Sequence, residues 1–349
     1  MIAHTTTFDH LVLSLAAFLL LAVPVADAGP PGEPHEVVDD PYLAPPAIRT
    51  TSPPAEVVRD GFVSVQVNVD AAGHNIVGDA ANEPSIAVDP TDPMRIAIGW
   101  RQFDAVASNF RQAGVGFSRD GGRTWTFPGP LDPGVFRSDP VLDAASDGTF
   151  HYDSLRVQGY DYWCELFSSA DAGSSWTAPV YAYGGDKAWM TVDRTGGIGE
   201  GNIYQAWDYA GCCGDDWFNR STDGAASWQP PIAIPGQPFW GVTTVGPDGT
   251  VYVAGSTDFD TGFAVAASST AQDPGQPLTF DGAWPVDLGG SLLHFLGYGP
   301  NPGGLLGQVW IAADQSGGPS HGTLYVLASG EPPGTDPLDV HLVRSNDGG

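Results

Sequence analysis

The sequence SRDGGRTW occupies residues 118–125, and two close copies follow it, SADAGSSW at residues 169–176 and STDGAASW at residues 221–228. A degenerate copy, AQDPG, begins at residue 271, and SNDGG, from residue 345, matches the first five residues of another. The copies recur at intervals of about 50 residues, with one longer interval, and this period is typical of propeller blades. The repeat predicts a chain built from several copies of one supersecondary unit.

Each copy follows three short runs rich in β-branched and aromatic residues, and turns of Asp, Gly and Pro separate the runs. Such runs predict strands. If the repeated motif is the turn between a third and a fourth strand, each unit is a four-stranded blade. The sequence therefore predicts an all-β propeller with about five visible blades. The three sets of runs are 85–88, 141–142, 189–192, 242–245 and 309–312; 95–98, 149–152, 202–205, 251–254 and 324–327; and 115–117, 162–164, 217–218, 263–265 and 340–343.

The residues of the repeated motif have structural roles. Its Asp can accept hydrogen bonds from backbone N–H groups across a tight turn. Its Gly permits a positive φ angle, and its Trp can bury an indole ring between neighbouring sheets. We expect these residues to stabilise the fold and to take no part in chemistry. They are Ser118, Asp120, Gly122, Trp125, Ser169, Asp171, Gly173, Trp176, Ser221, Asp223 and Trp228.

The composition is acidic and dominated by aspartate. Of 41 acidic residues, 34 are Asp and 7 are Glu, and this excess of a turn-forming residue favours strands and loops over helices. The net charge of −28, with only 13 Lys and Arg, would repel phosphate backbones, so we expect no nucleic-acid partner. Asp-rich loops are compatible with Ca²⁺, but no EF-hand spacing supports it, and we expect no cofactor or metal.

The N-terminus has the pattern of an export signal. Residues 11–26 are apolar, and the residues up to Ala28 fit a small-residue cleavage site. We therefore expect a signal peptide over residues 1–28 and a secreted, extracellular or periplasmic protein. The apolar stretch is short for a membrane span, and no other stretch is long and apolar enough to cross a bilayer. Residues 29–58 are rich in Pro and predict a disordered linker, and the propeller is expected over residues 62–349.

The chain contains three cysteines, Cys164, Cys212 and Cys213. In an exported protein this number predicts one disulfide and one remaining thiol. Cys164 could pair with either of the other two, or Cys212 and Cys213 could form a vicinal bridge. Metal binding by the adjacent pair, together with Asp215 and Asp216, is a further and weaker alternative, because no His lies at ligand spacing.

The repeated motif resembles the Asp box of the BNR-repeat proteins in the sialidase-like superfamily. The resemblance covers residues 83–349. It implies a propeller of six blades, of which this sequence shows five, so the chain is expected to be incomplete at its C-terminus. Residues 62–69 alternate cleanly, and we expect them to form the strand that closes the ring with the last blade. One fold hosts many functions, so the resemblance indicates the architecture better than the reaction.

In this superfamily the loops between second and third strands, and the connections between blades, surround a central site. Acidic and aromatic residues recur in these segments, as suits carbohydrate, because rings stack on sugars and carboxylates act as acid and base. The candidate catalytic residues are Glu83, Asp139, Asp186 and Asp208. The candidate substrate-binding residues are Arg101, Arg137, Arg156, Lys187, Trp207, Tyr209 and Trp240.

The arginine pattern departs from that of sialidases. Sialidases hold the substrate carboxylate with three arginines from separate blades and carry an Arg-Ile-Pro motif near the start. Here Arg95 and Ile96 are followed by Ala97, and no Arg or Lys lies between Arg220 and Arg344.

Three hypotheses about function remain open. The first is a secreted sialidase-like propeller that binds or hydrolyses extracellular glycans or glycoproteins at a non-standard site. The second is a true exo-α-sialidase that releases terminal sialic acid, and the third is a non-catalytic protein-interaction scaffold. If the protein is an enzyme, we expect a glycoside hydrolase of sialidase-like type.

Overall fold

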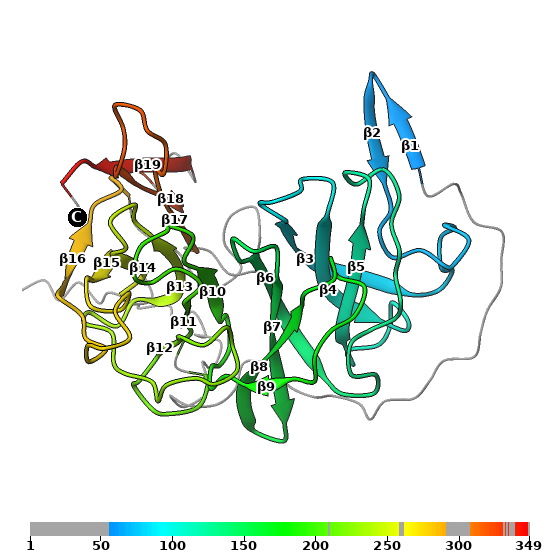
Figure 1. Cartoon of the computed structure of the whole chain (residues 1–349), viewed down its shortest axis with the longest axis horizontal. Coiled ribbons are helices and arrows are strands. Elements are labelled where there is room, and N and C mark those ends of the chain that lie inside the picture. Colours follow the sequence, from blue (N-terminus) through cyan, green and yellow to red (C-terminus); the bar gives the residue numbers. More distant parts are fainter. Residues whose placement is uncertain are drawn as a thin grey trace, which may run out of the picture. The chain divides into compact units, whose positions relative to one another are not determined.

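The computed structural model describes residues 56–208, 210–257, 262–290, 308–330, 332, 334 and 339–347 (Figure 1). The described residues contain only strands, turns and loops. Among them no helix is long and apolar enough to cross a membrane. The predicted signal peptide and residues 29–55 of the predicted linker lie outside the described residues.

Five antiparallel sheets follow one another along the chain, and we call them blades 1 to 5. Blade 1 contains β3 (Ala80–Val88), β4 (Ile96–Phe103) and β5 (Gln112–Ser118). Blade 2 contains β6 (Arg137–Ala144), β7 (Phe150–Gln158), β8 (Asp161–Ser169) and β9 (Val180–Tyr181). Blade 3 contains β10 (Trp189–Val192), β11 (Ile203–Ala206) and β12 (Phe218–Ser221). Blade 4 contains β13 (Phe239–Val245), β14 (Val251–Ser256), β15 (Phe263–Ser268) and β16 (Gly282–Val286), and blade 5 contains β17 (Val309–Ala313), β18 (Leu324–Gly330) and β19 (Asp339–Ser345).

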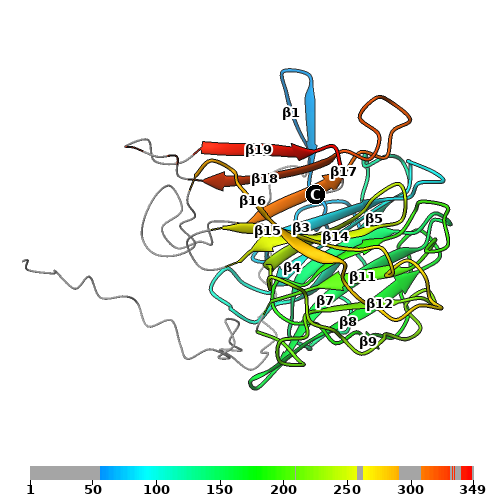
Figure 2. The same cartoon turned by 90° about the vertical axis from the view of Figure 1, so that its left-hand side faces the viewer.

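The blades are arranged as in a propeller, which confirms the predicted fold class. Within each blade consecutive strands pair as a meander, and Figure 2 shows β17, β18 and β19 as adjacent strands of one blade. The first strands contact one another in order: β3 with β6, β6 with β10, β10 with β13, and β13 with β17. In blades 1 and 3 the fourth strand is reduced to isolated bridges: Ala113 with Leu131 and Phe117 with Thr126 in blade 1, and Phe218 with Ile232 in blade 3.

Apolar side chains fill the spaces between successive blades. One cluster of buried residues joins blades 1 and 2, the largest joins blades 2, 3 and 4, and a third joins blades 4 and 5. The packing between blades 1 and 2 is so close that a Cβ atom added at Gly99 would lie 2.5 Å from Leu142 Cδ1 and Tyr152 Cε2. Interiors this dense hold the first strands in fixed relative positions.

The repeated motif forms the same hydrogen-bonded turn in three blades. The hydroxyl oxygens of Ser118, Ser169 and Ser221 accept the N–H of the residue four positions later, at 2.9–3.0 Å. The carboxylates of Asp120, Asp171 and Asp223 each accept an N–H at 2.9 Å and a hydroxyl from the residue four positions later. The fifth position of the motif has a positive φ in all three copies, even where the third copy has Ala225 in place of glycine.

The N-terminal strands differ from the prediction. β1 (Glu56–Arg59) pairs with β2 (Phe62–Val65) in a two-residue hairpin, so residues 56–58 belong to a strand and not to the predicted linker. β2 does not pair with blade 5, as ring closure would require, and Phe62 is 81% exposed. The chain then runs over blade 1, where Val67 lies against Gly116 and Val69 is buried. Local pairing of β-branched residues across a tight turn explains the hairpin.

The buried serine of the motif offers a stability test. Ser221 is fully buried, accepts the Ala225 N–H and donates to Asp223. Ser221→Ala leaves that N–H without a partner, and we expect the free energy of unfolding to fall by about 1–3 kcal/mol in urea titrations. Ser345→Ala, in the exposed last copy, is the matched control and should change it less. Equal losses in the two variants would contradict the structural role of the motif.

Candidate functional site

The first strands of the blades share an unusual backbone feature near their start. In blades 1, 2 and 4 the pairing of first and second strands shifts register, at residues 82–85, 138–141 and 239–242. Such bulges re-aim side chains and are frequent next to active sites. A positive φ is uncommon for residues other than glycine, yet each bulge contains one, and a fourth lies two residues before β10. The four residues are Glu83, Asp139, Lys187 and Trp240, with φ angles of 50°, 45°, 52° and 52°.

Asp139 is an almost fully buried carboxylate with a depressed pKa. Burial would raise its pKa, but the nearby Lys187 ammonium favours the charged form. The Ser138 hydroxyl donates to Oδ1 at 2.7 Å, and the Lys187 N–H donates to Oδ2 at 3.0 Å. Together these contacts hold the pKa of Asp139 below its usual value, so the carboxylate is ionised at neutral pH.

The pKa of Glu83, on the neighbouring blade, shifts in the opposite direction. Burial and then the charge of Asp139 raise the pKa of Glu83, although Arg101 and Lys187 act against them. Arg101 Nη2 lies 2.7 Å from Glu83 Oε1, and Arg101 Nε donates to Asn82 Oδ1 at 2.8 Å. The Glu83 side chain remains 39% exposed. One blade therefore presents an accessible carboxyl group that binds its proton more tightly, and the next presents a stable carboxylate.

Two further aspartates lie behind Asp139. Burial, followed by the charges of Asp208 and Asp139, raises the pKa of Asp186 well above its usual value. Burial raises the pKa of Asp208 to about 7. Asp208 receives the Trp240 indole N–H at 2.9 Å and the Ala210 N–H at 2.7 Å. The four candidate catalytic residues thus form one electrostatically linked group, in which only Glu83 is well exposed.

Arg111 and Tyr162 complete the group, although neither was among the candidate site residues. Burial lowers the pKa of Arg111, while Asp139, Tyr162 and Asp186 oppose that shift. Arg111 Nε donates to the Ser138 hydroxyl at 3.3 Å. The Tyr162 hydroxyl is buried without a partner among the described residues, and burial together with Asp186 raises its pKa. The alternation of side chains along β8 could have predicted that Tyr162 is buried. It could not have predicted that Tyr162 lies near the aspartates.

Two predicted substrate ligands occupy a different cluster. Arg137 is fully buried, and its Nη2 contacts Asp132 Oδ2 at 2.8 Å and Glu165 Oε2 at 2.5 Å. Arg156 Nη1 donates to Glu165 Oε1 at 3.0 Å, and its guanidinium lies over the Trp163 ring at 5.3 Å. Arg137 therefore cannot contact a ligand directly, because strand pairing carries it into the space between blades 1 and 2. Arg156 remains partly exposed.

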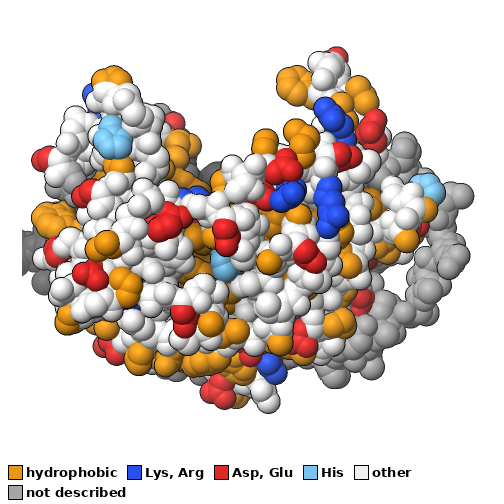
Figure 3. Space-filling view, viewed as in Figure 1, with side chains coloured by type: hydrophobic (Ala, Val, Ile, Leu, Met, Phe, Trp, Pro, Cys, Tyr) orange, Lys and Arg blue, Asp and Glu red, His pale blue; other side chains and the backbone are white. Residues whose placement is uncertain are grey.

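The predicted aromatic ligands are also buried. Trp207 is fully buried, and Trp240 is buried with its indole N–H bonded to Asp208. These rings are packed inside the protein and offer no free face for a sugar. Tyr209 lies outside the described residues. On the face drawn in Figure 3, acidic and basic side chains lie beside one another near β3.

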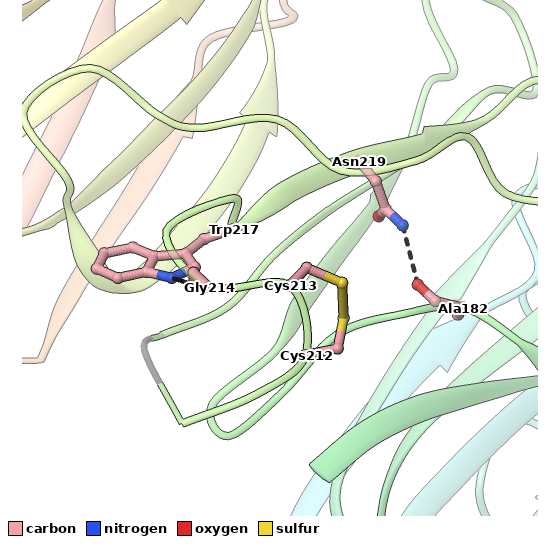
Figure 4. The surroundings of a disulfide bond; sticks show 6 residues. All are labelled: Ala182, Cys212, Cys213, Gly214, Trp217 and Asn219. Carbon is pink, nitrogen blue, oxygen red and sulfur yellow. Dashed lines mark hydrogen bonds between the residues drawn. A yellow bond between two sulfur atoms is a disulfide. The ribbon is translucent and has the colours of Figure 1, made fainter. Parts of the chain in front are cut away.

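A vicinal disulfide lies in the loop that begins at Asp208. Cys212 and Cys213 form the bridge, and Cys164 is a buried free thiol, so the alternative pairings with Cys164 are excluded in this structure (Figure 4). The Cys212 N–H donates to Gly184 O at 3.1 Å. The described residues contain no group of three or more His, Cys, Asp or Glu that could hold a metal ion. The hydrogen bond from Cys212 to Gly184 therefore links this loop to the segment that carries Asp186.

Comparisons with known proteins give a likeness in fold. No family model matches the chain, and no curated protein matches it. A Hadza microbial sialidase aligns with 81% of this chain and 56% of its own, at 13% identity and a TM-score of 0.47. A Trypanosoma rangeli sialidase aligns with 81% of this chain and 46% of its own, at 11% identity and a TM-score of 0.46. A Dyadobacter fermentans protein of unknown function aligns with 76% and 97%, at 14% identity and a TM-score of 0.44. This chain spans about half the length of the two sialidases, and at these values the likeness concerns the fold alone.

The cysteine arrangement predicts a simple labelling pattern. Burial raises the pKa of Cys164 well above its usual range, so the folded protein should not react with iodoacetamide. In denaturant without reductant we expect one label, on Cys164, and after reduction three. Peptide mapping by mass spectrometry distinguishes the pairings, because a bridge to Cys164 would place the single label on Cys212 or Cys213.

A buried aspartate outside the candidate group, Asp153, predicts a pH-dependent stability. Burial raises the pKa of Asp153 to about 7, and Gln205 Nε2 donates to its Oδ2 at 2.9 Å. The folded state then holds a proton that the unfolded state has lost, so this contribution to stability is present below about pH 4 and is lost as the pH rises through about 7. Asp153→Asn removes the titration.

The free energy of unfolding of Asp153→Asn, relative to the wild type, should therefore increase between pH 4 and 7, by at most about 1.4 kcal/mol per pH unit. Denaturant titrations at several pH values measure it. Asp147→Asn, in an exposed turn, is the control substitution. Parallel curves for the wild type and Asp153→Asn would contradict the assignment.

Proposed function

We propose that this protein is an exported propeller of the Asp-box type that hydrolyses extracellular glycans. The proposed site lies where the first strands of successive blades meet. The observation that carries the proposal is the pair formed by Glu83 and Asp139. Their pKa values shift in opposite directions, and both occupy positive-φ bulges on adjacent first strands. Titratable groups whose surroundings separate their pKa values in this way are candidates for an acid and base pair. Paired carboxyl groups are also the usual equipment of glycoside hydrolases.

The proposed chemistry divides two roles between the carboxyl groups. Glu83 is the general acid: its proton passes to the glycosidic oxygen as the bond from that oxygen to the anomeric carbon breaks. Asp139 is the anionic partner that stabilises the positive charge developing on the sugar ring. Water supplies the hydroxyl group that replaces the leaving sugar, and its second proton returns the acid to its starting state. Lys187 and Arg101 hold the two carboxyl groups in place through the contacts described above.

A true exo-α-sialidase has less support from the same residues. Sialidases bind a substrate carboxylate through arginines, and Arg137 is buried and bonded to Asp132 and Glu165. Arg156 contacts the same glutamate. These two arginines are therefore engaged by carboxylates of the protein and do not form a substrate clamp with Arg101. A neutral sugar needs no such clamp, so it fits the proposal better than a sialoside does.

The proposal is tested with purified protein on a panel of fluorogenic glycosides, sialosides included. With the substrate that is turned over, we expect Glu83→Gln to lower kcat/KM by about 10²- to 10⁴-fold, because an amide cannot donate the proton. Asp139→Asn should lower kcat/KM by at least the same factor. Glu56→Gln, in the exposed hairpin, is the control and should retain full activity.

The pH profile gives an independent check on the assignment. Activity should fall at acidic pH as Asp139 takes up a proton, at a pH below the usual pKa range of aspartate. It should fall again at higher pH as Glu83 loses its proton, at a pH above the usual pKa range of glutamate. Saturable glycan binding that survives both substitutions, with no turnover, would instead indicate a non-catalytic binding protein. Absence of both binding and turnover would favour the scaffold hypothesis.

A further inference from the structure

One backbone N–H group lies between two carboxyl groups in the site. The Lys187 N–H is 3.0 Å from Asp139 Oδ2 and 3.1 Å from Asp186 Oδ1. Both carboxyl groups are buried, and the shared donor holds them side by side. Like charges this close in a buried site do not both ionise readily, and a carboxyl group that keeps its proton can donate it to the other.

The donors around the pair identify which carboxyl group holds the proton. Asp139 receives the Ser138 hydroxyl and the Lys187 N–H, so both its oxygens are stabilised as acceptors. Asp186 receives the same Lys187 N–H on Oδ1. Its other neighbour, Asp208, is a third acid that already accepts two N–H groups. A charged Asp186 would therefore face acidic groups on both sides.

The backbone fixes Asp186 in this position. Its N–H donates to Ala210 O at 2.7 Å, and its carbonyl accepts the Asp208 N–H at 3.2 Å. The preceding residue, Gly185, bridges Gly211, and a Cβ atom at Gly185 would lie 2.5 Å from the Gly211 Cα. Asp186 is only 4% exposed, so it cannot turn outward to hydrate a charge.

We propose that Asp186 is a positioning residue that remains a neutral carboxylic acid and donates its proton to Asp139, thereby fixing the orientation of the Asp139 carboxylate. The catalytic part of this inference rests on the proposed function, whereas the neutral state of Asp186 does not. Asp186 contacts no reacting atom and acts only through Asp139. It differs in this from the catalytic role expected of it from the sequence.

The charged groups around the pair come from every neighbouring blade element. They determine the pH range over which the neutral state persists, and each would have to be considered in reading a titration. They are Glu83 on β3, Arg101 on β4, Arg111 before β5, Asp153 on β7, Tyr162 and Cys164 on β8, and Lys187 and Asp208 on either side of β10 and β11.

The experiment compares Asp186→Asn with Asp186→Ala. The introduced amide imitates a protonated carboxyl group, so Asp186→Asn should keep kcat within about threefold of the wild type and leave the acidic limb of the pH profile in place. Asp186→Ala leaves Asp139 without its donor. It should lower kcat on the order of 10- to 100-fold and move the acidic limb to higher pH.

Two further measurements do not depend on catalysis. Infrared spectra at pH 7 should show a protonated carboxyl band in the wild type that is reduced in Asp186→Asn. The free energy of unfolding of Asp186→Asn should also rise relative to the wild type as the pH increases above 4, because the wild type must keep a proton bound. These two measurements determine the protonation state of Asp186 even if no glycoside is hydrolysed.

Three results would overturn the inference. The first is an equal loss of activity in Asp186→Asn and Asp186→Ala, together with an unchanged infrared band. The second is a stability difference between the wild type and Asp186→Asn that does not vary with pH. The third is a stoichiometric divalent cation found by elemental analysis in the wild type and absent from Asp186→Asn, because a cation would then take the place of the proton.

Discussion

The contact between successive first strands is the interaction on which the site depends. Because β3, β6, β10 and β13 pack in order, residues about 50 positions apart in the sequence arrive beside one another. The hydrogen-bonded turn of the repeated motif follows the third strand in blades 1 to 3, and apolar clusters fix the blades against their neighbours. A polar group can then be assembled at the centre without any single blade containing it.

The bulges in the first strands bring polar side chains together where the blades pack. A regular first strand would direct alternate side chains into the two spaces between blades, where charged residues are costly. The positive φ at Glu83, Asp139 and Lys187 interrupts this alternation. Arg137 shows the contrast: it lies two residues before Asp139, ahead of the bulge, and its side chain is buried against Glu165. The cost of the strained backbone and buried charges is offset by Lys187, the only lysine in the chain.

The sequence predicted the fold more completely than the site. The repeat and the runs before it predicted the strand order of five blades, because periodicity and turn composition are local properties. The candidates Glu83, Asp139, Asp186, Asp208 and Lys187 were located by topology alone, and the structure brings them together. Burial could not be predicted, since alternation does not reveal a bulge, and so Arg137 and Trp207 were expected to be accessible.

Other features depend on contacts that no sequence pattern records. Arg111 precedes β5 and Tyr162 lies on β8, and both come near Asp186 because successive blades pack together. The vicinal disulfide was one of several pairings that three cysteines allow, and the sequence alone does not decide among them. The hairpin of β1 and β2 replaced the expected ring-closing strand because local pairing needs no distant partner.

The most direct measurement is a crystal structure of the protein soaked with the oligosaccharide that binds or is cleaved. Our account predicts a sugar ring at the centre of the first strands, with its glycosidic oxygen within hydrogen-bonding distance of the Glu83 carboxyl group. A sugar bound only at the outer edge of a blade, with the region of Glu83 and Asp139 unchanged, would contradict it.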